Sequence, residues 1–157
     1  MTTNANLFAR FAAHWDPDTQ LLTTPSGEGF TYRDALAKSG QVAQFLQDLG
    51  IRSGDRVSVQ AQKSVDYLWL FLGCLRGGFA FHPLNPAYTK SELAYFFTDA
   101  EPALVIYDPV SALQVHIRPA RPARLGATGG AAGSDWLQPR LRDSDQGGRV
   151  LNLGAVR

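Results

Sequence analysis

Apolar residues recur at intervals of three and four along four stretches of the chain, a spacing that places them on one face of an α-helix. The pattern predicts helices over residues 7–13, 33–49, 64–76 and 89–100. Gly50 ends the second helix and a glycine pair ends the third. The sequence TKSE at residues 89–92 has the Thr-x-x-Glu form of a capping box and opens the fourth.

Short runs of β-branched and aromatic residues lie between the helices and favour strands. They predict strands over residues 21–24, 30–32, 56–60, 79–82 and 103–107. The first two are separated by the five-residue turn PSGEG, so we expect a hairpin there. Pro83 is expected to stop the strand over residues 79–82, because proline cannot donate to a strand ladder.

Strands and helices alternate from residue 30 to residue 107, in the order βαβαβαβ. This order is typical of an α/β fold, in which right-handed crossovers build a parallel sheet with helices on its faces. We therefore expect residues 1–109 to form part of one α/β domain, opened by a helix and the hairpin. Residues 110–157 are expected to be an irregular, low-complexity tail.

The composition is that of a globular protein, with 157 residues, 45% of them apolar and 18% charged. A formal net charge of +1 gives no indication of binding to nucleic acid or to a membrane. The longest apolar run, residues 67–75, is about half of the ~20 residues that cross a bilayer. No signal-peptide pattern opens the chain and Cys74 is its single cysteine, so we expect a cytoplasmic protein.

The charge changes sign along the chain. Residues 1–111 carry a net charge of −3 and residues 112–157 one of +4, and 24 of those last 46 residues are Gly, Ala, Pro or Arg. These four amino acids have codons made only of G and C, so we hypothesise that the tail is translated out of frame; a true linker is the alternative. Arg118, Arg121 and Arg124 are too few to indicate a nucleic-acid site.

Five short segments occur in a characteristic order. They are FTYRDAL at residues 30–36, GDRV at 54–57, LRGGFAFHPLNP at 75–86, YT and EL at 88–93, and DAEP at 99–102. Together they resemble the adenylate-forming superfamily of acyl- and aryl-CoA synthetases, luciferases and peptide-synthetase adenylation domains. LNPAYT at residues 84–89 and NANLF at residues 4–8 are most similar to the malonyl-CoA synthetase branch.

The resemblance covers residues 4–109 and implies the early part of the family's N-terminal domain. It also implies an ATP-dependent acid–thiol ligase. In that family a carboxylate attacks the α-phosphate of Mg-ATP to give an acyl-adenylate and pyrophosphate, and the thiol of coenzyme A then displaces AMP. ATP, Mg²⁺ and CoA are thus implied for the full-length enzyme, whose phosphate loop, metal ligand and acid pocket lie downstream of this segment.

The chain has no lysine after Lys90 and no glutamate after Glu101. It therefore offers no candidate for the phosphate-loop Lys, the metal-binding Glu or the C-terminal-domain Lys that the resemblance implies. We expect no catalytic, cofactor-binding or metal-binding residue in it and no activity from it alone. The expected partner is the remainder of the ligase, with no nucleic acid and no membrane. The alternative is a small non-catalytic α/β module that pairs with another chain.

Some residues could suggest a site by their type alone. The glycine-rich stretch over residues 126–133 lacks the Lys-Ser/Thr of a Walker loop, so a linker is favoured. His14, His82 and His116 do not lie at metal-ligand spacing. Cys74 lies in the most apolar segment, where a thiol behaves as a small inert hydrophobe.

Aromatic and loop residues allow two interpretations. Tyr67, Trp69 and Phe71 are expected in the helix core rather than in a base-stacking platform, because no basic residues are interleaved with them. Asn85 and Tyr88 are expected to shape their proline-bracketed loop. A contribution of these two residues to ligand binding is the open alternative.

Overall fold

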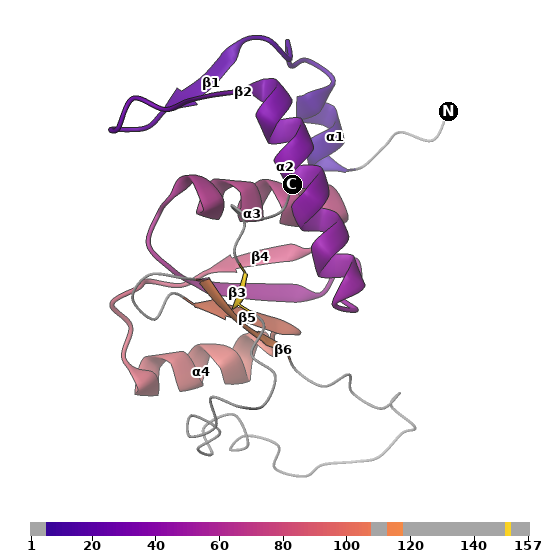
Figure 1. Ribbon diagram of the computed structural model, residues 1–157. Coiled ribbons are helices and arrows are strands. Elements are labelled where there is room, and N and C mark those ends of the chain that lie inside the picture. The colour runs from indigo at the N-terminus through magenta and orange to yellow at the C-terminus, as the bar shows by residue number, and fades with distance from the viewer. Residues whose placement is uncertain (1–5, 108–112, 118–149, 152–157) are drawn as a thin grey trace.

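Three parallel strands form the centre of the protein (Figure 1). The computed structural model describes residues 6–107 and the backbone of residues 113–117 and 150–151. Within it, β3 (Arg56–Gln60) lies between β4 (Ala80–Pro83) and β5 (Leu104–Tyr107) and runs parallel to both. Two antiparallel strands, β6 (Leu113–Ile117) and β7 (Val150–Leu151), continue the sheet in the order β4-β3-β5-β6-β7.

The helices and the hairpin follow the hydrophobic pattern. In the described part of the chain the helices are α1 (Leu7–Ala12), α2 (Tyr32–Asp48), α3 (Val65–Gly77) and α4 (Lys90–Ala100). Strands β1 (Gln20–Thr23) and β2 (Gly29–Thr31) pair antiparallel in a separate two-stranded sheet. Each predicted helix and strand is present, with its bounds within one residue of the prediction. The α/β fold class is therefore confirmed, with the hairpin outside the parallel sheet.

Strands β6 and β7 lie in the region for which only an irregular tail was predicted. β6 pairs with β5 over four positions, from Leu104 opposite Ile117 to Tyr107 opposite Gln114. Its sequence, LQVHI, alternates apolar and polar residues with the period of a strand, but the Gly, Ala, Pro and Arg around it concealed that signal. The rest of residues 110–157 lies almost entirely outside the described residues, so the boundary at residue 109 stays a prediction.

Pro83 is the last residue of β4, whereas the sequence predicted it to be the first residue after the strand. It lies opposite Val59 in the parallel ladder, and the next residue, Leu84, donates its N–H to the Val59 carbonyl at 2.8 Å. Among the described strands β4 is an edge, where a proline removes no N–H that a neighbouring strand needs.

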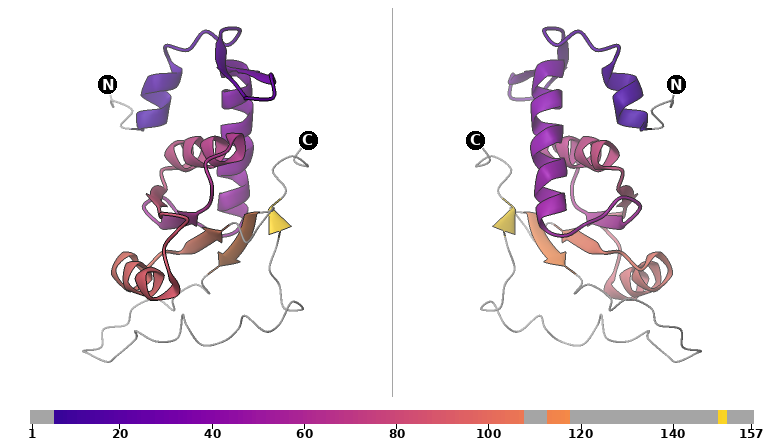
Figure 2. Two further views of the ribbon diagram at one scale, coloured as in Figure 1. Left: turned by 90° about the vertical axis from the view of Figure 1, so that its left-hand side faces the viewer. Right: turned by 90° about the vertical axis from the view of Figure 1, so that its right-hand side faces the viewer.

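Helices cover both faces of the sheet. Figures 1 and 2 show α3 on one face with α2 packed across it, and α4 on the opposite face. The apolar core lies between α2, α3 and the sheet; its most buried side chains include Leu46, Leu70, Val57, Leu104 and Ile106. No helix in the described part of the chain has the length and hydropathy that a membrane crossing requires.

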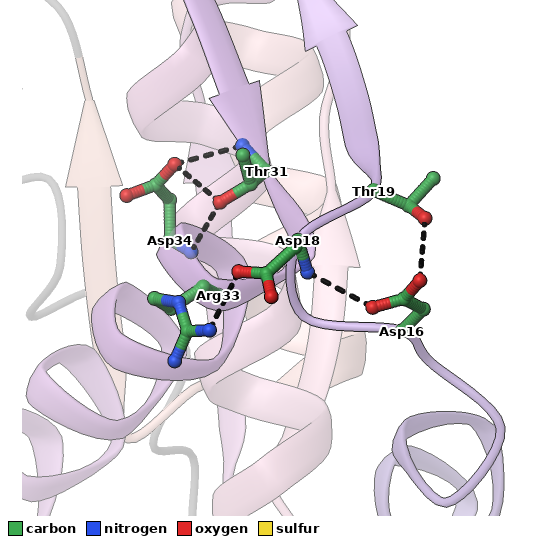
Figure 3. Close-up of polar contacts among 6 residues, drawn as sticks. All are labelled: Asp16, Asp18, Thr19, Thr31, Arg33 and Asp34. Carbon is green, nitrogen blue, oxygen red and sulfur yellow. Dashed lines mark hydrogen bonds and ion pairs between the residues drawn. The ribbon is translucent and has the colours of Figure 1, made fainter.

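A capping box opens α2 (Figure 3). The Thr31 Oγ1 accepts from the Asp34 N–H at 3.3 Å, and an Asp34 carboxylate oxygen accepts from the Thr31 N–H at 2.7 Å and from its hydroxyl at 2.9 Å. These hydrogen bonds, the one from the Thr31 backbone foremost, lower the pKa of Asp34. Beside the box, the exposed Arg33 guanidinium pairs with Asp18 at 2.6 Å. The FTYRDAL segment is thus a helix start.

The TKSE segment likewise opens α4. There the Glu92 carboxylate accepts two hydrogen bonds of 2.7 Å from Thr89, one from its backbone N–H and one from its hydroxyl.

Gly73 permits the close approach of α3 to α2. A Cβ atom at this position would lie 2.6 Å from the Val42 Cβ and 3.3 Å from the Ala43 backbone nitrogen, and real Cβ atoms essentially never come as close as the first of these distances. Val42 and Ala43 are themselves buried, so neither can give way into solvent. The two helices are therefore in contact along their backbones at this point.

We predict that Gly73→Ala lowers the free energy of unfolding by about 1–3 kcal/mol, the usual cost of overpacking a core. An alanine in a helix normally stabilises it relative to glycine, so the sign of the effect is diagnostic. Chemical denaturation of the full chain measures it, with Gln47→Ala on the exposed side of α2 as the control. A Gly73→Ala variant as stable as the wild type would contradict the close approach.

Candidate functional site

The carboxyl ends of β3 and β4 open into a cavity of about 470 Å³. It is lined by residues 61–63 after β3, by Tyr67 of α3 and by residues 83–86 at the end of β4. In α/β sheets ligands bind outside the carboxyl ends of the strands, so the cavity lies where the fold places a site. Lys63 is the charged residue of the lining.

Gln60 holds the loop that forms one wall of this cavity. It is the last residue of β3, and its Nε2 lies 3.3 Å from the Asn85 carbonyl oxygen, 3.3 Å from that of Pro86 and 3.1 Å from that of Tyr88. Two amide hydrogens are thus shared among three carbonyl groups of a loop that follows the neighbouring strand. The side chain gives these carbonyls a partner that no strand supplies.

Asn85 and Tyr88 shape this loop, in the way that the sequence suggested. The Asn85 Oδ1 accepts from the Ala87 N–H at 2.9 Å, which closes a turn within the loop. The Tyr88 ring stacks on Phe96 of α4 with 4.9 Å between the ring centroids and 20° between the planes. Asn85 also lines the cavity, so its contribution to ligand binding stays an open prediction.

His82 lies on the face of the sheet that α4 covers. Its Nδ1 is 2.9 Å from the Oγ of Ser58, which is fully buried on β3, and its ring meets Phe96 edge-on at 6.3 Å. Burial lowers the pKa of His82 from its ordinary value of 6.5, the positive charge of Arg56 adds to this, and Asp99 opposes it. The pair fixes the register of β3 against β4, and the buried hydroxyl has no room to meet a substrate.

Cys74 is buried in α3, and its burial raises the pKa of the thiol to about 12. A thiol with such a pKa is not a nucleophile at neutral pH, which agrees with the expected inert role. Trp69 is also buried and packs against Phe30 at 5.7 Å, as expected for helix core. Tyr67 is half-buried and packs against the core, as expected. Phe71 differs, because it meets Phe81 edge-on and is 37% exposed.

The remaining candidate residues do not form a site with these. His14 is exposed, Lys90 is the exposed first residue of α4, and Glu101 ends α4 with a left-handed φ of 41°. Among the described residues no three His, Cys, Asp or Glu side chains lie close enough together to hold a metal ion. The side chain of His116, the three tail arginines and the glycine-rich stretch over residues 126–133 lie outside the described residues.

The roles of Gln60 and Ser58 were not predicted from the sequence. A signal for both exists, because strand alternation in RVSVQ places Arg56, Ser58 and Gln60 on the face opposite the two valines. Polar residues at two successive positions on the inner strand of a parallel sheet require partners. What the alternation does not reveal is that the partners lie in the next strand and its loop, more than twenty residues away.

Comparison with known proteins decides the family. The family described as "AMP-binding enzyme" matches residues 8–145, which is most of the chain. The chain belongs to the AMP-binding enzyme family. The match runs past residue 109, the predicted end of the domain.

Individual AMP-binding enzymes resemble the chain over part of its length. Apo MatB from Rhodopseudomonas palustris is 45% identical with a TM-score of 0.66, over 68% of this chain and 22% of MatB. A Mycobacterium tuberculosis fatty acyl CoA synthetase is 31% identical with a TM-score of 0.59, over 64% of this chain and 20% of that protein. A linear gramicidin synthase of Brevibacillus parabrevis is 41% identical over 86 residues, which are 54% of this chain and 1% of that protein. The chain thus spans about a fifth of the length of these solved relatives.

We predict that Gln60→Ala speeds amide hydrogen exchange in the loop over residues 84–88, because three carbonyl groups lose their shared donor. The expected loss of stability is about 0.5–1.5 kcal/mol, the usual net contribution of a hydrogen bond, because Asn85 and Pro86 are exposed and the Asn85 carbonyl keeps the Tyr88 N–H as a partner. Hydrogen exchange read by mass spectrometry on the full chain measures both. Gln62→Ala, an exposed glutamine that also lines the cavity, is the matched control and should leave the loop unchanged. Equal exchange in the two variants would remove Gln60 from this role.

We predict that the free energy of unfolding falls as the pH falls through about 6.5, because the unfolded chain then binds a proton that folded His82 resists. Denaturation of the full chain at several values between about pH 8 and pH 5 measures this. His82→Asn, which keeps a hydrogen-bonding group for the Ser58 hydroxyl, should flatten the profile, and His14→Asn at an exposed position should not. Parallel profiles for all three proteins would show that the burial of His82 has no such effect.

Proposed function

We propose that this chain is a scaffold segment of an ATP-dependent acid–thiol ligase of the malonyl-CoA synthetase type. Such a ligase converts a carboxylate, ATP and CoA into acyl-CoA, AMP and pyrophosphate through an acyl-adenylate. The loop over residues 84–89 carries the proposal, because its sequence LNPAYT resembles that branch. MatB, at 45% identity, is also nearer to the chain in sequence than the fatty acyl CoA synthetase, at 31%, which supports the same branch.

Physically, the segment supplies position rather than chemistry. Gln60 fixes the loop over residues 84–88 beside a cavity at the carboxyl edge of the sheet, and α2 and α3 pack on one face of that sheet. Preorganised walls of this kind are what a ligase needs to hold a bound acid and nucleotide in line. We propose that the substrates meet this edge from the side on which the strands end.

The described residues do not fit a site for Mg-ATP. Phosphate transfer requires cations at the phosphates and acidic ligands for the metal, and no cluster of metal-ligating side chains occurs within the described residues. No step of ATP chemistry is therefore derived from this segment. We propose that ATP, Mg²⁺ and CoA are bound by the remainder of the ligase, which is the partner of this chain, and that the chain alone is inactive.

A second candidate function is amino-acid adenylation of the peptide-synthetase type. The 41% identity to the linear gramicidin synthase favours it. Both functions share the formation of an adenylate, and they differ in the acid and in whether free CoA is the thiol acceptor. The scaffold would serve either reaction equally, so the two are distinguished by the acid and the thiol that support AMP formation.

We predict that the full chain alone forms no AMP from malonate, ATP and CoA. With a polypeptide that comprises the part of R. palustris MatB outside the matched segment, we expect AMP formation that requires both malonate and CoA. A coupled assay for AMP measures the rate, with each polypeptide alone as the control. The reason is that the matched segment lacks the phosphate-binding lysine and the metal ligand, and the added polypeptide supplies them.

Two outcomes would contradict the proposal. AMP formation by the chain alone would show that it contains catalytic groups. Failure of the two polypeptides together to form AMP would show that the chain does not replace the matched segment of such a ligase.

A further inference from the structure

Phe96 of α4 contacts the chain on both sides of the loop that forms one wall of the cavity. Its ring stacks on Tyr88, the last residue of the loop over residues 84–88, with 4.9 Å between the centroids and 20° between the planes. The same ring meets His82 of β4, just before the loop, edge-on at 6.3 Å. Phe96 is half-buried between these partners. One side chain of α4 therefore touches the strand that enters the loop and the residue that ends it.

Tyr88 is held from two directions. The Gln60 side chain of β3 donates to the Tyr88 carbonyl at 3.1 Å, whereas the ring of Tyr88 lies against Phe96 of α4. The Tyr88 N–H in turn donates to the Asn85 carbonyl at 3.0 Å, and Asn85 lines the cavity. A shift of the Tyr88 ring is thus passed on to a residue of the cavity wall.

Of the two supports of the loop, α4 is the less firmly held. It lies on the face of the sheet opposite α3 (Figure 1), and none of its eleven residues is buried, whereas α2 and α3 bury five each. Elements with few buried apolar contacts open locally at a lower free energy than elements of the core. The position of α4 therefore depends on half-buried contacts such as those of Phe96.

We infer that Phe96 is a positioning residue for the cavity wall, which acts through Tyr88 to hold the loop over residues 84–88 in place. The wall then keeps its shape only while α4 is packed on the sheet. The effect on the reaction rests on the proposed function, in which the substrates meet this edge of the sheet. The coupling of α4 to the loop is a property of the chain itself and is measurable without any ligase activity.

The first test is amide hydrogen exchange on the full chain. Phe96→Ala should speed exchange of the Ala87 and Tyr88 amides at least about fivefold, because the loop loses its stacked partner. Both of these N–H groups are bonded to Asn85 in the structure, so their exchange reports the order of the loop. Phe96→Tyr keeps the ring and should leave both rates within about twofold of the wild type.

Tyr95→Ala is the matched control. Tyr95 is the neighbouring aromatic residue of the same helix and is 70% exposed. Alanine favours a helix over phenylalanine and over tyrosine to a similar degree, so both alanine variants change the intrinsic stability of α4 alike. Tyr95→Ala should leave the loop as protected as in the wild type, and exchange in α2 and α3 should be unchanged in all three variants.

The second test uses AMP formation by the chain together with the MatB polypeptide. Phe96→Ala should raise the KM of malonate or of CoA at least about threefold and change kcat less, because a displaced wall weakens binding while the catalytic groups of the added polypeptide are intact. A merely structural defect leaves less active complex, which lowers kcat at unchanged KM. Phe96→Tyr should restore the KM of the wild type.

The outcomes separate this inference from the proposed function. Faster loop exchange in Phe96→Ala, with protection retained in Phe96→Tyr, supports the positioning of the loop even if no AMP forms and the ligase proposal fails. Loop exchange that is equally fast in Phe96→Ala and Tyr95→Ala, or that rises equally in α2 and α3, overturns it while the ligase proposal stands. A fall in kcat at unchanged KM also overturns the role of Phe96 in substrate binding.

Discussion

The backbone contact between α2 and α3 is the constraint on which the rest of the structure depends. Only a residue without a Cβ lets α3 approach Val42 and Ala43 so closely, and this approach places both helices over one face of the sheet. Arg76, in the last turn of α3, then bridges the pair by donating to the Leu36 carbonyl at 2.6 Å, and its guanidinium lies over the Phe8 ring at 5.4 Å. The N-terminal helix is thereby held to the core, at the edge of the sheet where β3 and β4 begin.

The two faces of the sheet follow different physical rules. On the side of α2 and α3 the strands present valine, leucine and isoleucine, and burial of apolar surface stabilises the packing. On the side of α4 the inner strand presents the polar residues Ser58 and Gln60. Their side chains can be buried there because β4 and the loop after it supply hydrogen-bond partners. The apolar face makes the fold stable, whereas the polar one fixes the positions of a strand and a loop relative to each other.

Local signals in the sequence were sufficient for almost every element between residues 6 and 107. The helix starts, the hairpin turn and the glycine ends each depend on residues close together in the chain, so their bounds were predictable. Long-range features were not predictable in the same way. The bonds from Gln60 to the loop after β4, and the pairing of LQVHI with β5, depend on where the chain returns in space. The candidate cavity combines residues from three elements, and no spacing in the sequence predicted that they meet.

The motifs that identify the family are, in this structure, features of folding rather than of chemistry. The FTYRDAL segment contains the capping box of α2, and DAEP contains Glu101, the left-handed residue that ends α4 before a proline. GDRV and LRGG are joined directly, because the Gly54 N–H donates to the Gly78 carbonyl at 2.8 Å where α3 ends with a φ of 73°. A segment built from such signals can support ligases and adenylation domains with different acids, since the same turns and caps serve each of them. Similarity over this segment therefore shows the family firmly, and the choice of acid has to come from residues that line the path of the substrate.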